Sequence, residues 1–243
     1  MPSPHPFRLP VAMVLRAPLW TSRHQAGLAL ADVFADRQGL RGDTTLVALP
    51  RGGVPVAAAM ASRLGLPLVT WSVRKVADPS WPELAIGAVA AGGVVVWRNG
   101  ARGRQRATTA TEHGWLRAQE LELERRQRLF GDPPGDQLRG RHLIVVDDGI
   151  ATGMTVKAAL LSLRRMHPAS LALAVPVVDR EVAGELGRLV ERLEALAVVG
   201  DLQAVGLWYE HFEQLSDGQV LALLQGCRAG MPSSAPAPPV SGP

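Results

Sequence analysis

Residues 142–155 read HLIVVDDGIATGMT, and this stretch decides the fold class of the chain. Residues 143–147 form an apolar run that ends on a pair of adjacent carboxylates, Asp147 and Asp148. Continuous apolar runs are typical of strands that a parallel sheet buries on both faces. The loop that follows is rich in Gly and Thr and leads into a helical stretch at 154–166. The pattern therefore predicts a strand, a loop and a helix, with the acidic pair at the carboxyl end of the strand.

The rest of the chain alternates short β-rich runs with helical stretches and contains no internal repeat. Two runs, 85–90 and 94–97, flank Gly92 and Gly93, which favour the tight turn of an antiparallel hairpin. The alternation predicts an α/β fold, a doubly wound parallel sheet with flanking helices and a β-hairpin insertion. We expect its strands at 44–49, 68–74, 143–147, 170–177 and 194–199, and its helices at 54–64, 109–130, 154–166 and 180–193.

Ligands of doubly wound sheets bind at the carboxyl ends of the strands, so the loops in that position are the candidate ligand sites. These loops follow Leu49, Arg74 and Asp147. The third loop carries both carboxylates and is the most informative of the three.

This third loop has the composition of a phosphate site. Backbone N–H groups of a glycine-rich loop and of a helix start bind phosphate, and the hydroxyls of Thr152 and Thr155 add further donors. Asp147 and Asp148 stand directly before this loop, one sugar away from a bound phosphate. There they can accept hydrogen bonds from the vicinal hydroxyls of that sugar. The chain contains neither the Walker phosphate-loop pattern nor the GxGxxG dinucleotide pattern, so we interpret the loop as a ribose 5-phosphate pocket. The alternative is an ordinary strand-to-helix turn with an Asx cap, which needs only one aspartate.

Residues 145–155, VVDDGIATGMT, resemble the phosphoribosyl pyrophosphate (PRPP) motif of type I phosphoribosyltransferases. Two earlier segments are similar to a branch of predicted enzymes of that family, PRGGVPVA at 50–57 and the run from RK to PELAIGAV at 74–89. A late aromatic stretch, AVGLWYEHF at 204–212, is similar to the same branch. The resemblance extends over about 20–224.

Three positions depart from the branch. Ser22 stands where the branch has an aspartate before Arg23, which leaves open whether position 22 makes a salt bridge. Ala77 and Trp81 stand where the branch has a glycine and an asparagine nearby, and both positions bear on the flexibility of the loop there.

The resemblance implies a PRPP-dependent phosphoribosyltransferase, which moves the ribose 5-phosphate group to a nitrogenous acceptor and releases pyrophosphate. It gives Asp147 and Asp148 the catalytic role, together with direct or water-mediated contact to Mg²⁺. The residues that it implies for binding the PRPP phosphate are Gly149, Ile150, Ala151, Thr152, Gly153, Met154 and Thr155. Those that it implies for binding pyrophosphate are Arg51, Gly52, Gly53, Arg74 and Lys75.

The acceptor, a nucleobase or related heterocycle, is left open. In this fold a small hood selects it, and the resemblance implies a hood built from the N-terminal segment, from the residues near Trp208 and Tyr209, or from both. These aromatic rings either stack on a base or belong to the core or an interface. Ala151 stands where hypoxanthine-guanine enzymes place an aspartate, which argues against a 6-oxopurine. A regulatory protein that senses PRPP or a nucleotide without turnover is the alternative function, and a homodimer is expected by analogy.

The composition is that of one globular domain. The chain has 243 residues, of which 47% are hydrophobic and 20% charged, and no apolar run reaches the ~18 residues of a membrane span. We expect a phosphoribosyltransferase-like domain at 20–226, a flexible leader at 1–19 and a disordered Pro-rich tail at 227–243.

The charge and cysteine content narrow the partners and the compartment. The net charge is +4, but the basic residues are dispersed rather than grouped, so we expect no specific nucleic-acid partner. The single cysteine, Cys227, cannot form an intrachain disulfide or a cysteine-based metal cluster. This content fits a cytoplasmic protein.

Overall fold

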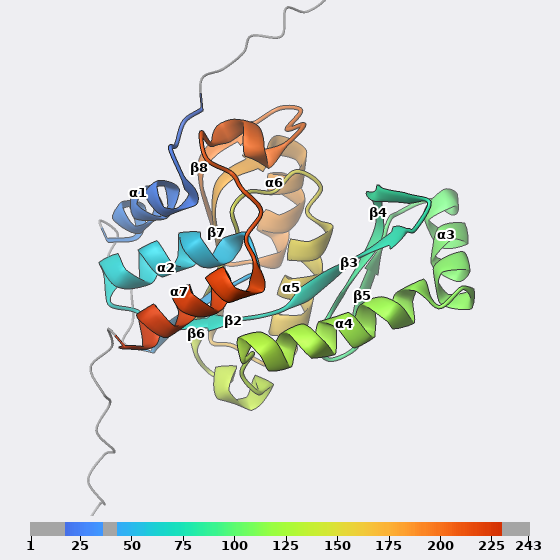
Figure 1. Ribbon diagram of the computed structural model, residues 1–243, viewed down its shortest axis with the longest axis horizontal. Coiled ribbons are helices and arrows are strands. Elements are labelled where there is room, and N and C mark those ends of the chain that lie inside the picture. Colours follow the sequence, from blue (N-terminus) through green and yellow to red (C-terminus); the bar gives the residue numbers. More distant parts are fainter. Residues whose placement is uncertain (1–17, 36–42, 230–243) are drawn as a thin grey trace, which may run out of the picture.

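The computed structural model describes residues 18–35 and 43–229, which form an α/β fold (Figure 1). Its centre is a five-stranded parallel sheet with the order β2-β1-β6-β7-β8, so the predicted fold class is confirmed. The strands are β1 (Thr44–Ala48), β2 (Leu68–Thr70), β6 (His142–Val146), β7 (Ser170–Asp179) and β8 (Arg192–Val199). The expected leader and tail lie outside the described residues, except at their inner ends.

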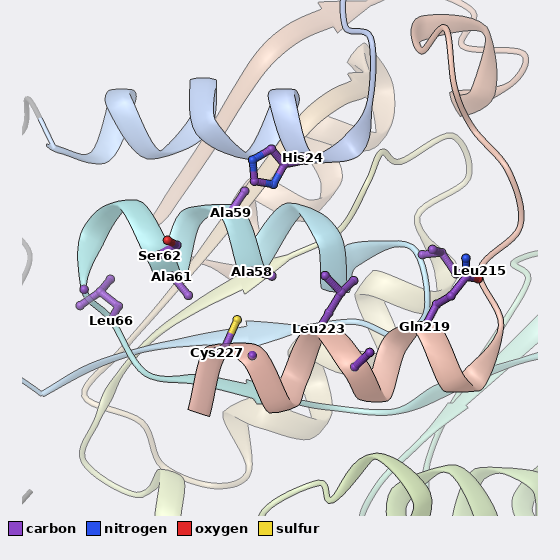
Figure 2. A pocket seen from close by; sticks show the side chains of 13 residues that line it. His24, Ala58, Ala59, Ala61, Ser62, Leu66, Leu215, Gln219, Leu223 and Cys227 are labelled. Atoms are coloured by element: carbon purple, nitrogen blue, oxygen red, sulfur yellow. The ribbon is translucent and has the colours of Figure 1, made fainter. Parts of the chain in front are cut away.

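Helices cover both faces of this sheet (Figure 1). One face carries α1 (Arg23–Ala35), α2 (Gly53–Leu64) and α7 (Asp217–Ala229), and the other carries α5 (Met154–Arg164) and α6 (Arg180–Leu186). Alternate side chains of each strand point to opposite faces of the sheet. Ile144 therefore packs with α1, α2 and α7, and Val145 packs with α5. A cavity of about 710 Å³ opens between α2 and α7, lined mainly by small and apolar side chains (Figure 2).

A second, antiparallel sheet projects from one side of the main sheet (Figure 1). It consists of β3 (Val73–Asp78), β4 (Trp81–Ala90) and β5 (Val94–Trp97), accompanied by α3 (Ala101–Glu112) and α4 (Trp115–Phe130). β4 and β5 form the expected hairpin, which turns through Gly92 and Gly93 with positive φ angles. We call residues 73–130 the second lobe.

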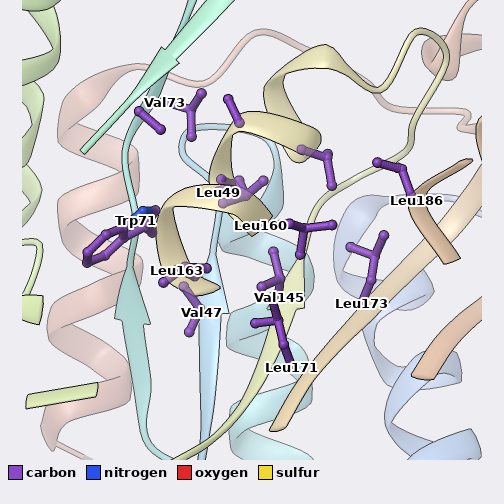
Figure 3. Packing of buried hydrophobic residues seen from close by; sticks show 14 of the residues in the cluster. Val47, Leu49, Trp71, Val73, Val145, Leu160, Leu163, Leu171, Leu173 and Leu186 are labelled. Atoms are coloured by element: carbon purple, nitrogen blue, oxygen red, sulfur yellow. The ribbon is translucent and has the colours of Figure 1, made fainter. Parts of the chain in front are cut away.

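Helix α5 joins the two sheets. Leu160 and Leu163 of this helix belong to one buried cluster with Val145 of the main sheet and Trp71 before the second sheet (Figure 3). The indole Nε1 of Trp71 donates to Ser162 Oγ at 3.1 Å, which ties the same helix to the crossover between the sheets. The main sheet and the second lobe therefore share one core.

The strand expected at 68–74 is wrong in extent, because the chain changes sheets within it. β2 ends at Thr70, and β3 begins three residues later in the second sheet. Asp132, just after α4, holds this crossover: its carboxylate accepts from Thr70 Oγ1 at 2.7 Å and from the Ser72 N–H at 2.5 Å. Burial raises the pKa of Asp132 above its ordinary value. No local sequence pattern marks a crossover that a distant carboxylate fixes.

Two expected helices are also wrong in extent. The helix expected at 109–130 is two helices, α3 and α4, which meet at Gly114, whose φ is +72°. The helix expected at 180–193 ends early with α6. After α6, Glu191 binds the chain to β7. Its N–H donates to Leu171 O at 2.9 Å, and its carboxylate accepts from the Leu171 N–H at 2.6 Å. Helices α1 and α7 match no element that we expected.

The order of the strands reverses between β1 and β6. From β1 the chain moves outward to β2, and after the second lobe it returns to the other side of β1 as β6. The loops after these two strands lie side by side, and the Leu49 N–H donates to Val146 O at 3.0 Å. Ligands of doubly wound sheets bind at such a reversal, so the fold places the candidate site between these loops.

Candidate functional site

The two loops that the sequence singled out separately are in direct contact. β6 ends just before Asp147 and Asp148, and the Asp148 N–H donates to Asp147 Oδ1 at 2.9 Å. A Cβ on Gly52 would lie 2.1 Å from Asp148 Oδ2, and one on Gly53 would lie 2.5 Å from Val146 O. These glycines are therefore required by the close approach of the loop after β1 to the acidic pair.

Arg23, at the start of α1, is a site residue that sequence reasoning missed. Its Nε donates to Asp148 Oδ2 at 2.7 Å, and one terminal nitrogen donates to Glu213 O at 3.1 Å. Its guanidinium carbon lies 3.7 Å from the centre of the Phe212 ring. The side chains of Arg23 and Asp148 are only 11% and 14% exposed, so this is a largely buried ion pair.

One cation therefore faces two carboxylates. Burial raises the pKa of Asp147 well above its ordinary value, and the neighbouring charge of Asp148 raises it further. Burial also raises the pKa of Asp148, although the ion pair with Arg23 opposes that shift. The charge of Arg23 does not balance the negative charge of both carboxylates, so hydroxyl donors or a further cation would stabilise the ionised form of the acidic pair.

The loop at 149–155 is fixed to β7 by its backbone. The Ile150 N–H donates to Val177 O at 2.9 Å, and Ile150 O accepts from the Asp179 N–H at 3.0 Å. The Ile150 side chain is buried in the core and its N–H donates to β7, so this residue anchors the loop and does not offer that N–H to a ligand. Gly153, with a φ of +72°, stands directly before α5, and the loop thus reaches the amino end of that helix.

Of the two loop hydroxyls predicted to bind phosphate, Thr152 is exposed and Thr155 is half-buried in the first turn of α5. Met154 is half-buried and packs against the core cluster around α5. Ala151 packs with the aromatic cluster around Tyr209. The arrangement gives an anion backbone amides, two hydroxyls and a helix start.

Tyr209 positions the acidic loop. Its hydroxyl donates to Asp148 O at 2.5 Å, and its ring packs against Trp20 and stacks on Phe212 with centroids 5.6 and 5.1 Å away. The residue is 4% exposed, and burial raises the pKa of its hydroxyl. Between the two roles left open for this aromatic stretch, Tyr209 therefore has the core role, whereas Trp208 is half-exposed.

The three basic residues predicted to bind pyrophosphate do not all lie in the same region. Arg51, on the loop after β1, lies 3.5 Å from Asp217 Oδ1, and its peptide bond with Pro50 is cis. Arg74, on β3, donates twice to Gln119 Oε1, at 3.1 and 2.8 Å. Lys75 follows Arg74 along the strand and therefore points to the opposite face, where it is exposed. Arg51 and Arg74 thus belong to one region and Lys75 does not.

Three further findings concern a cavity, metal ligands and membrane-spanning helices in the described residues. The cavity between α2 and α7 is lined by none of the residues predicted for the site. Within residues 18–35 and 43–229, no three His, Cys, Asp or Glu side chains are grouped to hold a metal ion. The same ranges contain no helix with the length and hydropathy needed to cross a membrane.

The fold and the site define an α/β protein with a candidate ribose phosphate pocket at the reversal of its sheet. The sequence model of the family described as "Phosphoribosyl transferase domain" matches residues 24–191. Two curated proteins of Mycobacterium tuberculosis, each described as "Putative phosphoribosyl transferase", are 36% identical over 207 residues, which is 85% of this chain and 46% of theirs. The chain therefore spans about half the length of these relatives.

A solved structure agrees with this assignment. The crystal structure of TT1426 from Thermus thermophilus shares 35% sequence identity with this chain and superposes with a TM-score of 0.67. The match covers 85% of this chain and 98% of TT1426. The chain belongs to the phosphoribosyl transferase domain family, and the family resemblance that the sequence carries is confirmed.

Proposed function

We propose that this protein transfers the ribose 5-phosphate group of PRPP to a nitrogenous acceptor and releases pyrophosphate. The observation that carries the proposal is the direct contact between the acidic pair of 147–148 and the glycines of 52–53 at the reversal of the sheet. When the loop after β6 holds the ribose, the substituent on its C1 lies close to the loop after β1. This arrangement suits cleavage of the bond between ribose and pyrophosphate.

The acidic pair binds and orients the ribose. Asp147 and Asp148 accept hydrogen bonds from vicinal ribose hydroxyls, which offsets the unfavourable burial that raises both of their pKa values. Their charges also stabilise the positive charge that develops on the ribose ring as the bond to pyrophosphate loosens. The amides of 149–155 other than that of Ile150, which donates to Val177 O, hold the 5-phosphate together with the hydroxyls of Thr152 and Thr155.

The leaving pyrophosphate is bound by the loop after β1. Gly52 gives it a backbone N–H at close range, and Arg51 and Arg74 give it positive charge. The N–H of Gly53 already donates to Leu49 O at 3.0 Å, so Gly53 serves the close approach to the acidic loop and not the ligand. These donors stabilise the negative charge that grows on pyrophosphate as it departs.

The acidic pair also fits a magnesium ion. Two carboxylates share one arginine, and hard oxygen ligands are the ones that Mg²⁺ prefers. Asp147 and Asp148 would hold the ion directly or through water, together with oxygens of PRPP, because the described residues offer no third ligand. When bound, Mg²⁺ supplies positive charge that stabilises the leaving group.

A panel of acceptors tests the proposal. The full chain is incubated with PRPP, Mg²⁺ and single nucleobases or related heterocycles, and pyrophosphate release is measured. We expect release with at least one acceptor, and weaker activity with 6-oxopurines because Ala151 offers no proton acceptor. Tight PRPP binding without release for any acceptor would support the sensor instead, and absence of PRPP binding would contradict both functions.

A further inference from the structure

A chain of ion pairs connects the loop after β1 with α4 and α7. Arg51 lies 3.5 Å from Asp217 Oδ1, and Arg125 lies 3.2 Å from Asp217 Oδ2. Arg125 also donates to both oxygens of Glu122, at 2.7 and 3.0 Å, and Arg126 donates to Glu122 Oε1 at 2.9 Å. One carboxylate of α7 thus bridges the loop predicted to bind pyrophosphate to a helix of the second lobe.

Positive charge is in excess in this region. The arginine cluster consists of Arg51, Arg74, Arg125 and Arg126, and among the described residues its ion pairs are with two carboxylates, those of Asp217 and Glu122. Partial burial and the charge of Arg126 lower the pKa of Arg74, and hydrogen bonds from Arg125 and Arg126 lower the pKa of Glu122 to about 2. The arginine cluster therefore suits a ligand with several negative charges.

Asp217 is held in place by the start of its helix. Ser216 Oγ accepts from the Gln219 N–H at 3.2 Å, and Gln219 Oε1 accepts from the Ser216 N–H at 2.9 Å, which is a reciprocal capping box. The capping box fixes the first turn of α7, so Asp217 stays beside Arg51 and Arg125 while its side chain remains 31% exposed. The side chains of Arg51 and Arg125 are 26% and 49% exposed, so a dissolved anion can reach them, whereas Arg126 is 13% exposed and adds its charge from beneath, through Glu122.

We propose that Arg125 and Arg126 extend the pyrophosphate site across to α4, and that Asp217 occupies this site in the absence of the anion. The inference rests on the proposed function and deepens it. Pyrophosphate oxygens take the place of the Asp217 carboxylate on Arg51 and Arg125, and the ligand then contacts both the main sheet and the second lobe. Neither arginine of α4 belongs to a segment whose sequence resembles a family motif.

Calorimetric titration of the full chain with pyrophosphate tests the inference. Because Asp217→Asn removes the competing charge and keeps the side-chain shape, we expect pyrophosphate to bind about fivefold more tightly. Arg125→Gln and Arg126→Gln each remove a charged donor, and we expect binding to weaken about tenfold.

Two matched variants serve as controls. Asp32→Asn removes the carboxylate of an exposed pair with Arg63, and Arg117→Gln removes an arginine of α4 that pairs only with Glu120 among the described residues. Both should bind pyrophosphate within about twofold of the unmodified protein, because their ion pairs involve no member of the arginine cluster. Thermal melting checks that every variant is folded.

The outcomes separate the inference from the proposed function. Unchanged or weaker binding by folded Asp217→Asn would overturn the role of Asp217, and unchanged binding by folded Arg125→Gln and Arg126→Gln would overturn the extended site. PRPP binding with no pyrophosphate binding would overturn the inference and leave the proposed function standing. A protein that binds neither compound would overturn both.

Discussion

The acidic pair follows β6, and Arg51 of the arginine cluster follows the neighbouring strand β1, but the two groups differ in how their charges are balanced. In the part of the chain that the structure describes, Asp148 pairs with one cation, Arg23, whose charge also acts on Asp147, and burial raises the pKa of both carboxyls. The arginine cluster is more exposed and paired with internal carboxylates, so that the pKa of Glu122 is lowered to about 2. The acidic pair therefore carries buried negative charge that Arg23 offsets only in part, whereas arginines of the cluster are paired with Asp217 and Glu122.

Removal of the one counter-ion should have the largest effect on stability. Arg23→Gln leaves Asp148 buried without its ion pair, and we expect the free energy of unfolding to fall by about 3 kcal/mol. Arg63→Gln is the control, because its pair with Asp32 is about 60% exposed and should contribute less than about 1 kcal/mol. Urea unfolding at pH 7 measures both, and equal losses in the two variants would contradict the special position of Arg23.

A methyl group on the loop that touches the acidic pair should have the next largest effect. In Gly52→Ala the new Cβ overlaps the Asp148 carboxylate, and we expect a loss of about 2 kcal/mol. Gly184→Ala in α6 meets no atom within 4 Å, and we expect no loss or a gain of up to about 1 kcal/mol. If thermal melting finds Gly52→Ala as stable as the unmodified protein, the two loops are not in the contact described.

Neutralisation of one carboxylate should have a smaller effect of the opposite sign. Asp147→Asn keeps the oxygen that accepts from the Asp148 N–H and removes like-charge repulsion, so we expect a gain of about 1 kcal/mol at pH 7.5. The pKa of Asp147 is higher in the folded state than in the unfolded state, so ionisation lowers the stability of the unmodified protein as pH rises. The gain should therefore shrink at pH 4.5, and a pH-independent difference in urea unfolding would show that the charge of Asp147 is not its cause.

The sequence was sufficient to predict the local structural units that carry the candidate site residues. The apolar run before Asp147, the glycine-rich loop after it and the helix at 154–166 follow each other along the chain, so periodicity and turn residues predict them. The glycines at 52–53 were also found from the sequence, and the structure gives their reason, which is the approach to Asp148.

The contacts between distant segments could not be predicted in this way. Arg23 and Asp148 are 125 residues apart, Arg51 and Asp217 are 166 apart, and no local pattern marks either pair. The same limit explains why the sequence pattern predicts one strand across the crossover at Thr70. The domain boundaries at 20–226, the homodimer and the cytoplasmic location remain predictions.

The central claim is that the acidic pair holds the ribose of PRPP, and calorimetric titration with PRPP and Mg²⁺ tests it most directly. We predict saturable binding to the unmodified chain and binding at least about 100-fold weaker to a folded Asp147→Asn/Asp148→Asn variant, because charged acceptors for the ribose hydroxyls are lost. Equal affinity of the two proteins for PRPP would contradict the claim.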